Sequence, residues 1–345
     1  MDNLLEVCGL QTSFRTEQGE VVSVDEVSFQ LRPGETIAIV GESGCGKSVT
    51  SLSVMRLLGK NGSIKKGKIL LNGKNLVQLS ESDMRKIRGR EISMIFQEPM
   101  TALNPVFTIG NQLIEGLQHH LRMESSDAKA YAVGMLKSVG IPRAEAIMKE
   151  YPHALSGGMR QRVMIAMALS CKPKLIIADE PTTALDVTIQ AQILELMKKL
   201  RDEYRTAMML ITHDLGVVAE MADTVMVMYA GQVVEEADVF TLFENPKHPY
   251  TIGLMKSIPH LVCESDERLV SIPGAVPSLL HMPQGCRFQS RCPYATEKCL
   301  QSPPLFQLGE GHAVRCWLSE ADIEKGEDVP NEYAGKNTTS TVITS

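Results

Sequence analysis

The chain has 345 residues, 43% of them hydrophobic, which is enough for a sizeable core in one large domain and a smaller one. Its formal net charge of −6 offers no overall basic field for nucleic acid. The N-terminus has no secretory leader pattern, and no apolar run approaches the roughly 20 residues that span a membrane, so we expect a cytoplasmic protein outside the bilayer.

Apolar runs alternate with helical patterns from about residue 35 onward. The run "ETIAIV" (35–40) predicts a buried strand, which leads through a glycine-rich turn into the predicted helix "KSVTSLSVMRLL". Two further strands are predicted at "KLIIADE" (174–180) and "AMMLITH" (207–213). The helical stripe between them consists of Ile189, Ile193, Leu196, Met197 and Leu200. Strand, helix and strand in this order predict a largely parallel sheet with helices on its faces.

The rest of the chain divides into segments that differ in hydrophobic pattern and in proline content. Residues 103–170 look mostly helical and predict a helical subdomain inserted into an α/β domain of residues 1–244. The stretch "TVMVMYAGQVVEEA" predicts a hairpin that turns near Ala230 and Gly231. Frequent prolines after about residue 245 predict a separate, loop-rich C-terminal module of residues 245–320. The polar tail, 321–345, is predicted to be disordered.

The segment "GESGCGKS" (41–48) fits the phosphate-loop pattern and lies between a predicted strand and a predicted helix. Gly41, Gly44 and Gly46 would let backbone amides surround phosphate oxygens at a helix N-terminus. Lys47 would reach the β- and γ-phosphates, and Ser48 would bind Mg²⁺. The alternative is a glycine-rich turn with a solvated lysine.

Two other segments carry phosphate chemistry. The strand "LIIADE" ends in Asp179 and Glu180, which could hold Mg²⁺ and polarise an attacking water; the plain alternative is a solvated strand end. In "LSGGMRQR" (155–162), Ser156 is a natural N-cap, and Gly157 and Gly158 expose amides at a helix start. That stretch alone would be an ordinary capped helix, but the combination indicates two phosphate-binding devices in one chain.

The ordered set "GESGCGKS", Gln97 in "FQEPM", "LSGGMRQR", "LIIADEP", Asp186 in "TALD" and His213 in "LITHD" resembles the nucleotide-binding subunits of ABC transporters over about residues 4–240. The resemblance implies a P-loop NTPase fold of the α/β class, with a RecA-like mixed sheet, an inserted helical subdomain and a small C-terminal module. It also implies a head-to-tail dimer in which two ATP molecules lie between one subunit's phosphate loop and the other's signature helix.

The resemblance assigns roles residue by residue. Glu180, His213 and Gln97 would be catalytic, with His213 holding the γ-phosphate and Gln97 linking the site to the membrane subunit. Asp186 would organise the dimer seam, and Phe14 would stack on adenine. The expected Mg²⁺ ligands are Ser48, Gln97 and Asp179. The expected nucleotide-binding residues are Phe14, Gly41, Ser43, Gly44, Cys45, Gly46, Lys47, Ser48, Val49, Ser156, Gly157, Gly158, Gln161 and Asp186.

The stretches "FQEPMTALNP" (96–105) and "NPKHPYTIGLMKSIP" (245–259) resemble the peptide, dipeptide and nickel importer branch. This implies an ATPase at the cytoplasmic face of the membrane that works with two permease subunits, a second related ATPase or another copy of itself and, indirectly, an extracytoplasmic peptide-binding protein. The solute is not written in the sequence, so oligopeptide or dipeptide follows from the branch alone. The alternative function is that of a soluble ABC ATPase that acts on nucleic acid or ribosomes. A third possibility, a P-loop kinase, is disfavoured because kinases do not need the signature motif.

Half of the eight cysteines lie near the C-terminus, namely Cys286, Cys292, Cys299 and Cys316. A reducing compartment disfavours disulfides, and spacings of five, six and sixteen residues differ from the paired ligands typical of zinc sites. Four thiolates are the complement of a [4Fe-4S] cluster, and some ATPases of the peptide-importer branch carry a similar motif that holds one. An iron-sulfur cluster is therefore the prediction, with zinc, disulfides and free thiols as alternatives.

Overall fold

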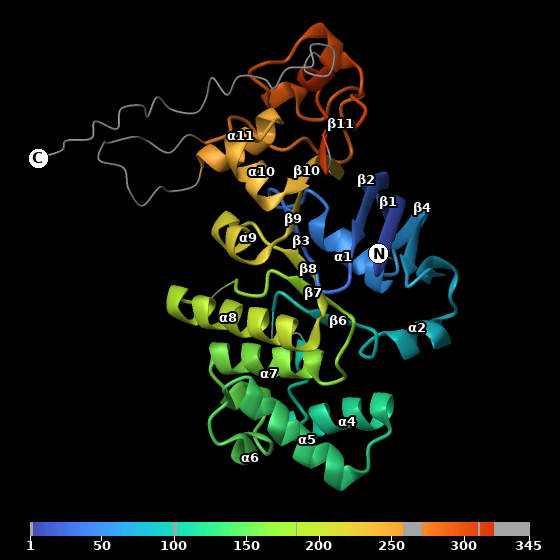
Figure 1. Ribbon diagram of the computed structural model, residues 1–345. Helices are drawn as coiled ribbons and strands as arrows, with labels where there is room; N and C mark the ends of the chain where they lie inside the picture. Colours follow the sequence, from blue (N-terminus) through green and yellow to red (C-terminus); the bar gives the residue numbers. More distant parts are fainter. Residues whose placement is uncertain (1–2, 99–101, 184, 258–270, 310, 321–345) are drawn as a thin grey trace, which may run out of the picture.

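The computed structural model describes residues 3–98, 102–183, 185–257, 271–309 and 311–320 (Figure 1). Within these ranges the strands form a four-stranded antiparallel sheet, in the order β2-β1-β4-β5, and an eight-stranded mixed sheet, in the order β11-β12-β10-β9-β3-β8-β7-β6. The predicted disordered tail and residues 99–101 of the "FQEPMTALNP" stretch lie outside the described residues.

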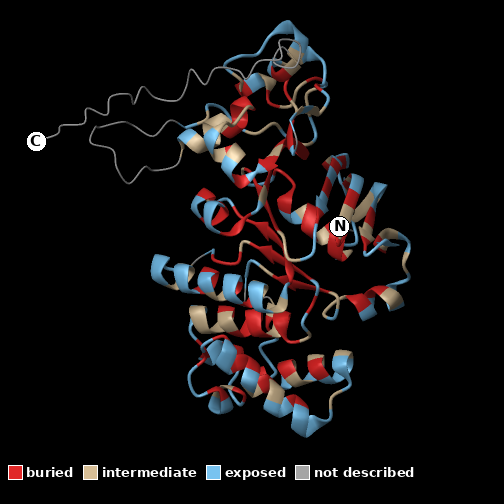
Figure 2. Ribbon diagram, viewed as in Figure 1, coloured by how far each residue is buried: buried red, intermediate tan, exposed pale blue. Residues whose placement is uncertain are grey.

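The parallel part of the larger sheet is buried on both faces. Its strands are β6 (Ile92–Ile95), β7 (Leu175–Asp179), β8 (Ala207–Ile211), β3 (Thr36–Val40) and β9 (Thr224–Tyr229). Every residue of β3, β7 and β8 is buried, as expected for continuous apolar runs covered on both sides (Figure 2). The strands predicted at 35–40, 174–180 and 207–213 are therefore confirmed.

Helices follow the parallel strands and cover the sheet. The helix bounds are α1 (Lys47–Met55), α2 (Glu81–Ile87), α4 (Ile109–Leu121), α5 (Ser125–Ser138), α6 (Ala144–Ile147), α7 (Gly157–Leu169), α8 (Val187–Tyr204), α9 (Leu215–Met221), α10 (Val239–Glu244) and α11 (Pro249–Lys256), with 3-10 turns η1 (Leu76–Gln78), η2 (Pro152–Ala154), η3 (Gln289–Arg291) and η4 (Glu297–Leu300). The predicted stripe on α8 points inward, because Ile193, Met197 and Leu200 are buried. Helices α4 to α7 form the end of the molecule opposite the C-terminal region (Figure 1).

The antiparallel sheet at the N-terminal side was not predicted. It consists of β1 (Leu5–Thr16), β2 (Gly19–Leu31), β4 (Gly62–Leu71) and β5 (Lys74–Asn75). Helix α1 packs against β1 and β2, and the apolar residues of this sheet share one core cluster with β3 and β8. The sheet thus supports the helix that begins at the phosphate loop.

The C-terminal region, predicted as a separate loop-rich module, contributes two strands to the central sheet. Strands β11 (Phe306–Gly309) and β12 (His312–Val314) extend the central sheet beyond the hairpin of β9 and β10 (Gln232–Asp238), which turns at Ala230 and Gly231 as expected. Buried Glu235 on β10 accepts hydrogen bonds from the backbone amides of Lys247 (2.7 Å) and His248 (2.9 Å), and it contacts His312 Nε2 at 2.9 Å. Glu235 therefore ties the C-terminal region into the same structural unit.

Candidate functional site

The phosphate loop follows β3 and leads into α1. Gly41, Gly44 and Gly46 have φ angles of 149°, 77° and 105°. A Cβ atom on Gly41 would lie only 2.2 Å from the carbonyl oxygen of Met228, so the loop requires glycine there. Lys47 is 6% exposed, and its Nζ donates to the carbonyl oxygens of Gly41 (2.7 Å) and Glu42 (3.1 Å). The loop and its lysine therefore form a compact turn at the start of α1.

Ser48 and Asp179 meet across the edge of the sheet. Ser48 Oγ donates to Asp179 Oδ1 at 3.1 Å, which joins the start of α1 to the end of β7. Burial raises the pKa of Asp179 above its ordinary value, and the hydrogen bond from Ser48 partly offsets this rise. A hydroxyl and a carboxylate oxygen at this spacing suit a Mg²⁺ ion, which prefers oxygen ligands.

Glu180 is the centre of a polar network. Its carboxylate accepts hydrogen bonds from Gln97 Nε2 (2.8 Å) and Thr183 Oγ1 (3.0 Å), and it lies 3.3 Å from His213 Nδ1. The backbone of Glu180 has a φ of 46°, which costs energy for a residue with a side chain and is typical of functional positions. Three strand ends, those of β6, β7 and β8, thereby bring Gln97, Glu180 and His213 together.

The signature segment begins helix α7 as predicted. Ser156 is the N-cap, and its Oγ accepts a hydrogen bond from the Met159 amide at 3.3 Å. Ser156 and Gly157 are exposed, whereas a Cβ on Gly158 would lie 3.0 Å from the Ile189 side chain of α8. The exposed helix start is available to an anion from outside this chain.

Other predicted site residues lie in different settings. Gln161 is 2% exposed and donates to the Pro181 carbonyl, so its amide is already engaged within the chain. Asp186 caps α8 by accepting from the Ile189 amide at 3.0 Å. Phe14 is half-buried on β1, and its ring lies over Gly62, where a Cβ would be 2.7 Å away. Cys45 is buried, consistent with a small filler, whereas Ser43 is exposed and Val49 is half-buried.

The sequence interpretation missed several residues at the site. Thr183 follows Glu180 by three residues, and this turn spacing was the only local signal for its contact. Tyr250 and Arg291 come from the C-terminal region and contact Glu42 inside the phosphate loop. No local signal points to such contacts between segments more than 200 residues apart.

The four C-terminal cysteines line a single pocket with a volume of about 200 Å³. All four are free thiols, and burial is the main cause that raises the pKa of Cys286, Cys292 and Cys316, the last to about 12. His248 also lines the pocket, and within the described part of the chain its buried Nε2 has no hydrogen-bond partner. Among the described residues, no group of three or more His, Cys, Asp or Glu has the geometry to hold a metal ion.

The described residues include no helix with the length and apolar character needed to cross a membrane.

Two protein-family models match the chain. One, described as ABC transporter, matches residues 24–183, and the other, described as the C-terminal region of oligopeptide/dipeptide transporters, matches residues 234–299. The first includes the phosphate loop, the signature segment, Gln97, Glu180 and Thr183, whereas His213 of the Glu180 network lies beyond the matched residues. The second includes three of the four clustered cysteines.

Similar individual proteins point to the same family as the two protein-family models. The oligopeptide transport ATP-binding protein AppD of Bacillus subtilis is 57% identical over 324 residues, which cover 93% of this chain and 98% of AppD. OppD of Haemophilus influenzae is 52% identical, with 92% and 98% covered. Among solved structures, the dimeric post-hydrolysis state of the ATP-binding cassette MJ0796, bound to ADP and Pi, has a TM-score of 0.62 at 26% identity and covers 68% of this chain and 98% of that one.

Proposed function

The chain belongs to the ATP-binding proteins of the oligopeptide/dipeptide ABC transporter family, and we propose that it hydrolyses ATP to power peptide import across the cell membrane. One observation carries this function. The phosphate loop, the Glu180 network and an exposed signature helix occur in a chain that also has the peptide-transporter C-terminal region.

The chain's residues divide the chemistry among them. The phosphate loop and Lys47 bind the phosphates, while Ser48 and Asp179 would hold Mg²⁺, which would supply positive charge against the phosphates. Glu180 accepts a proton from the attacking water, and its hydrogen bonds from Gln97 and Thr183 fix the direction of its carboxylate. His213 lies beside Glu180, where it would contact the γ-phosphate.

Assembly completes the site. The cassette MJ0796 was solved as a dimer, and Ser156 and Gly157 are exposed here, so we propose that the signature helix of a second ATPase closes over this chain's phosphate loop. That partner is either a related subunit or a second copy. The complex would sit at the cytoplasmic face of the membrane on two permease subunits, supplied by an extracytoplasmic peptide-binding protein.

Reconstitution tests the transport function. Proteoliposomes that contain the permease subunits, the ATPase pair and the peptide-binding protein should accumulate peptide only when ATP is supplied to the ATPase side. ATP hydrolysis that responds to nucleic acid or ribosomes, and not to the peptide-loaded binding protein, would replace this function with the alternative.

We expect Lys47→Ala to weaken ATP binding by roughly thirtyfold, or about 2 kcal/mol, because a charge-assisted hydrogen bond to phosphate is lost. A nucleotide titration of the full chain measures the change. Lys60→Ala, which removes an exposed lysine outside the loop, is the control and should leave the affinity unchanged. Equal affinities in the two variants would contradict the phosphate-binding role of Lys47.

We further propose that Cys286, Cys292, Cys299 and Cys316 hold a [4Fe-4S] cluster. Four thiols share one pocket, and His248 on its wall fits a cluster because its Nδ1 accepts a hydrogen bond from the Tyr250 amide at 3.0 Å, which leaves the proton on the unpartnered Nε2. An N–H donor of this kind suits the sulfur atoms of a cluster. The irregular spacing of the four cysteines in the sequence, unlike the paired ligands typical of zinc, favours a cluster over zinc.

Anaerobic purification followed by iron and sulfide analysis should give about four of each per chain, with a visible absorption band. Cys286→Ser should lower both contents, whereas Cys8→Ser, at an exposed cysteine on β1, should not. One equivalent of zinc without iron would select the zinc alternative. A colourless, metal-free protein that is folded and active would show that the four cysteines hold no cluster.

A further inference from the structure

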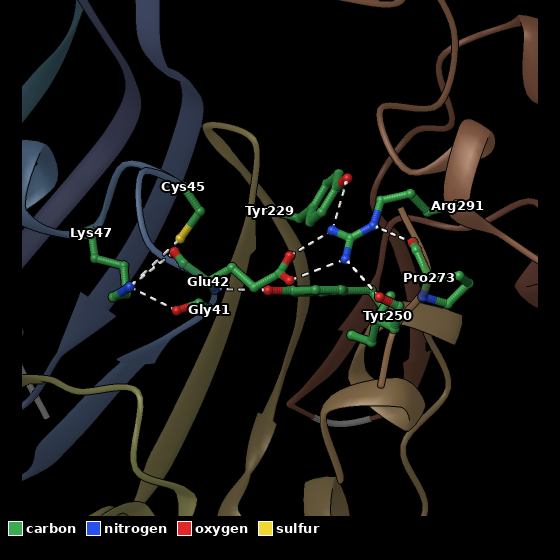
Figure 3. Close-up of polar contacts among 9 residues, drawn as sticks. Gly41, Glu42, Cys45, Lys47, Tyr229, Tyr250, Pro273 and Arg291 are labelled. Carbon is green, nitrogen blue, oxygen red and sulfur yellow. Dashed lines mark hydrogen bonds and ion pairs between the residues drawn. The ribbon is translucent and has the colours of Figure 1, made fainter. Parts of the chain in front are cut away.

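The C-terminal region contacts the phosphate loop at Glu42, which is a residue of that loop. Arg291 donates to both carboxylate oxygens of Glu42, with Nη1 to Oε2 at 2.6 Å and Nη2 to Oε1 at 3.1 Å (Figure 3). This bidentate contact joins two residues that are 249 positions apart in the sequence. Paired, charge-assisted hydrogen bonds of this kind fix orientation as well as distance.

Arg291 is itself held rigidly. Its side chain is 3% exposed, and it also donates to the carbonyl oxygens of Pro273 (2.9 Å) and Ile272 (3.3 Å) and to Tyr229 Oη (3.4 Å). The guanidinium carbon lies 5.9 Å from the ring centroid of Phe288, whose edge meets Tyr229. The guanidinium is therefore aimed at Glu42 by several independent contacts.

The backbone of Glu42 is fixed at the same time. Its amide donates to Tyr250 Oη at 2.8 Å, and its carbonyl oxygen accepts from Lys47 Nζ at 3.1 Å (Figure 3). Tyr250 is fully buried, and burial raises its pKa, so its hydroxyl stays protonated. Glu42 is thus held at its amide, its carbonyl and its carboxylate, two of these by the C-terminal region.

We propose that Arg291 and Tyr250 are positioning residues for nucleotide binding, which act on the phosphate loop through Glu42. This inference rests on the proposed ATPase function. Arg291 sets the loop's conformation and neutralises a carboxylate that would otherwise oppose the phosphates from within the loop that binds them. Because Arg291 directly precedes Cys292, the loop that lines the cysteine pocket also carries the residue that shapes the phosphate loop.

A double-mutant cycle measures this action. The probe is Mg·ADP, titrated into the full-length chain, because ADP gives a binding constant without turnover. Arg291→Ala should weaken binding about tenfold, within the range expected for directly contacting residues. Adding Glu42→Gln to that variant should restore most of the affinity, because the unpaired carboxylate is gone. Arg291→Lys keeps the charge but not the paired geometry, and it should lie between wild type and Arg291→Ala.

Arg287→Ala is the matched control. Arg287 comes from the same region, its side chain is 13% exposed, and it pairs with Asp25 outside the phosphate loop. Its loss should lower the thermal unfolding temperature comparably to Arg291→Ala while Mg·ADP affinity stays at the wild-type value. Tyr250→Phe, which removes the acceptor for the Glu42 amide, should also weaken binding. In the assembled ATPase, Arg291→Ala should raise KM for ATP and leave kcat unchanged.

The outcomes separate this inference from the ATPase function. A wild-type chain that does not bind Mg·ADP would overturn the function itself. The positioning role is wrong if the wild type binds Mg·ADP and Lys47→Ala weakens that binding, but Arg291→Ala does not. If Arg287→Ala weakens binding as much as Arg291→Ala, or if Glu42→Gln brings no recovery, the effect is general loosening of the C-terminal region and the inference fails.

Discussion

Glu180→Gln should leave ATP binding intact while turnover falls by at least about a hundredfold, the usual contribution of a positioned general base. Glutamine keeps the size of the side chain and can still accept a hydrogen bond from Gln97 or Thr183, so the network survives. What it loses is the negative charge that accepts a proton from water. The phosphate loop, Lys47 and Ser48 are untouched, so the affinity for ATP should not change.

Two measurements check this expectation on the assembled transporter, namely a nucleotide titration and single-turnover hydrolysis of bound ATP. Glu195→Gln, at an exposed position on α8, makes the same chemical change away from the site and should hydrolyse ATP normally. Hydrolysis by the Glu180→Gln assembly at the wild-type rate would show that another group activates the water. Loss of ATP binding in the variant would instead assign Glu180 to the nucleotide cradle.

Ser156→Arg should abolish hydrolysis in the assembly while each separate chain still binds ATP. The substitution removes an N-cap, at a cost of about 1 kcal/mol in stability, and places a long side chain where the partner's nucleotide is expected to dock. Without closure, the amides of the signature helix cannot contact the partner's phosphates. Removing such donors lowers turnover by about a hundred- to a thousandfold.

Ser80→Arg separates the loss of a helix N-cap from the block to dimer closure. Ser80 is also an exposed N-cap, accepting from the Asp83 amide at 3.2 Å at the start of α2, so its replacement costs a similar cap and leaves the signature segment alone. We expect normal hydrolysis from that variant and ATP-dependent dimerisation by size-exclusion chromatography. A Ser156→Arg chain that dimerises and hydrolyses like Ser80→Arg would refute the closed-dimer arrangement.

The chemistry of the ATP site was predictable because each part is a local pattern. The phosphate loop, the acidic pair after β7 and the capped signature helix each need only a short segment with the right spacing, and adjacent parallel strands then bring their ends to one edge of the sheet. The gathering of four cysteines near the C-terminus is visible in the sequence, whereas only the structure shows that all four line one pocket. Thr183 was missed, since its spacing of three residues from Glu180 is a weak signal that many solvated turns share.

The N-terminal sheet and the placement of the C-terminal region were not predictable in this way. The antiparallel pairings of β1 with β2 and β4 are interrupted by register shifts, which blur the alternation that predicts a strand. The prolines after residue 245 correctly indicate loops, but they do not show that β12 pairs with β10.

The sequence by itself determined the family and the ATPase class, and it supplied the residues that we propose for the nucleotide site, because these depend on residue type and short-range spacing. Only the tertiary structure decided that Glu42 is held by Arg291 and Tyr250, and that Arg291 reaches the phosphate loop from a position next to Cys292 of the cysteine pocket. Such contacts join segments that are brought together by burial of a common core, and that burial is a property of the whole fold. No local spacing records it.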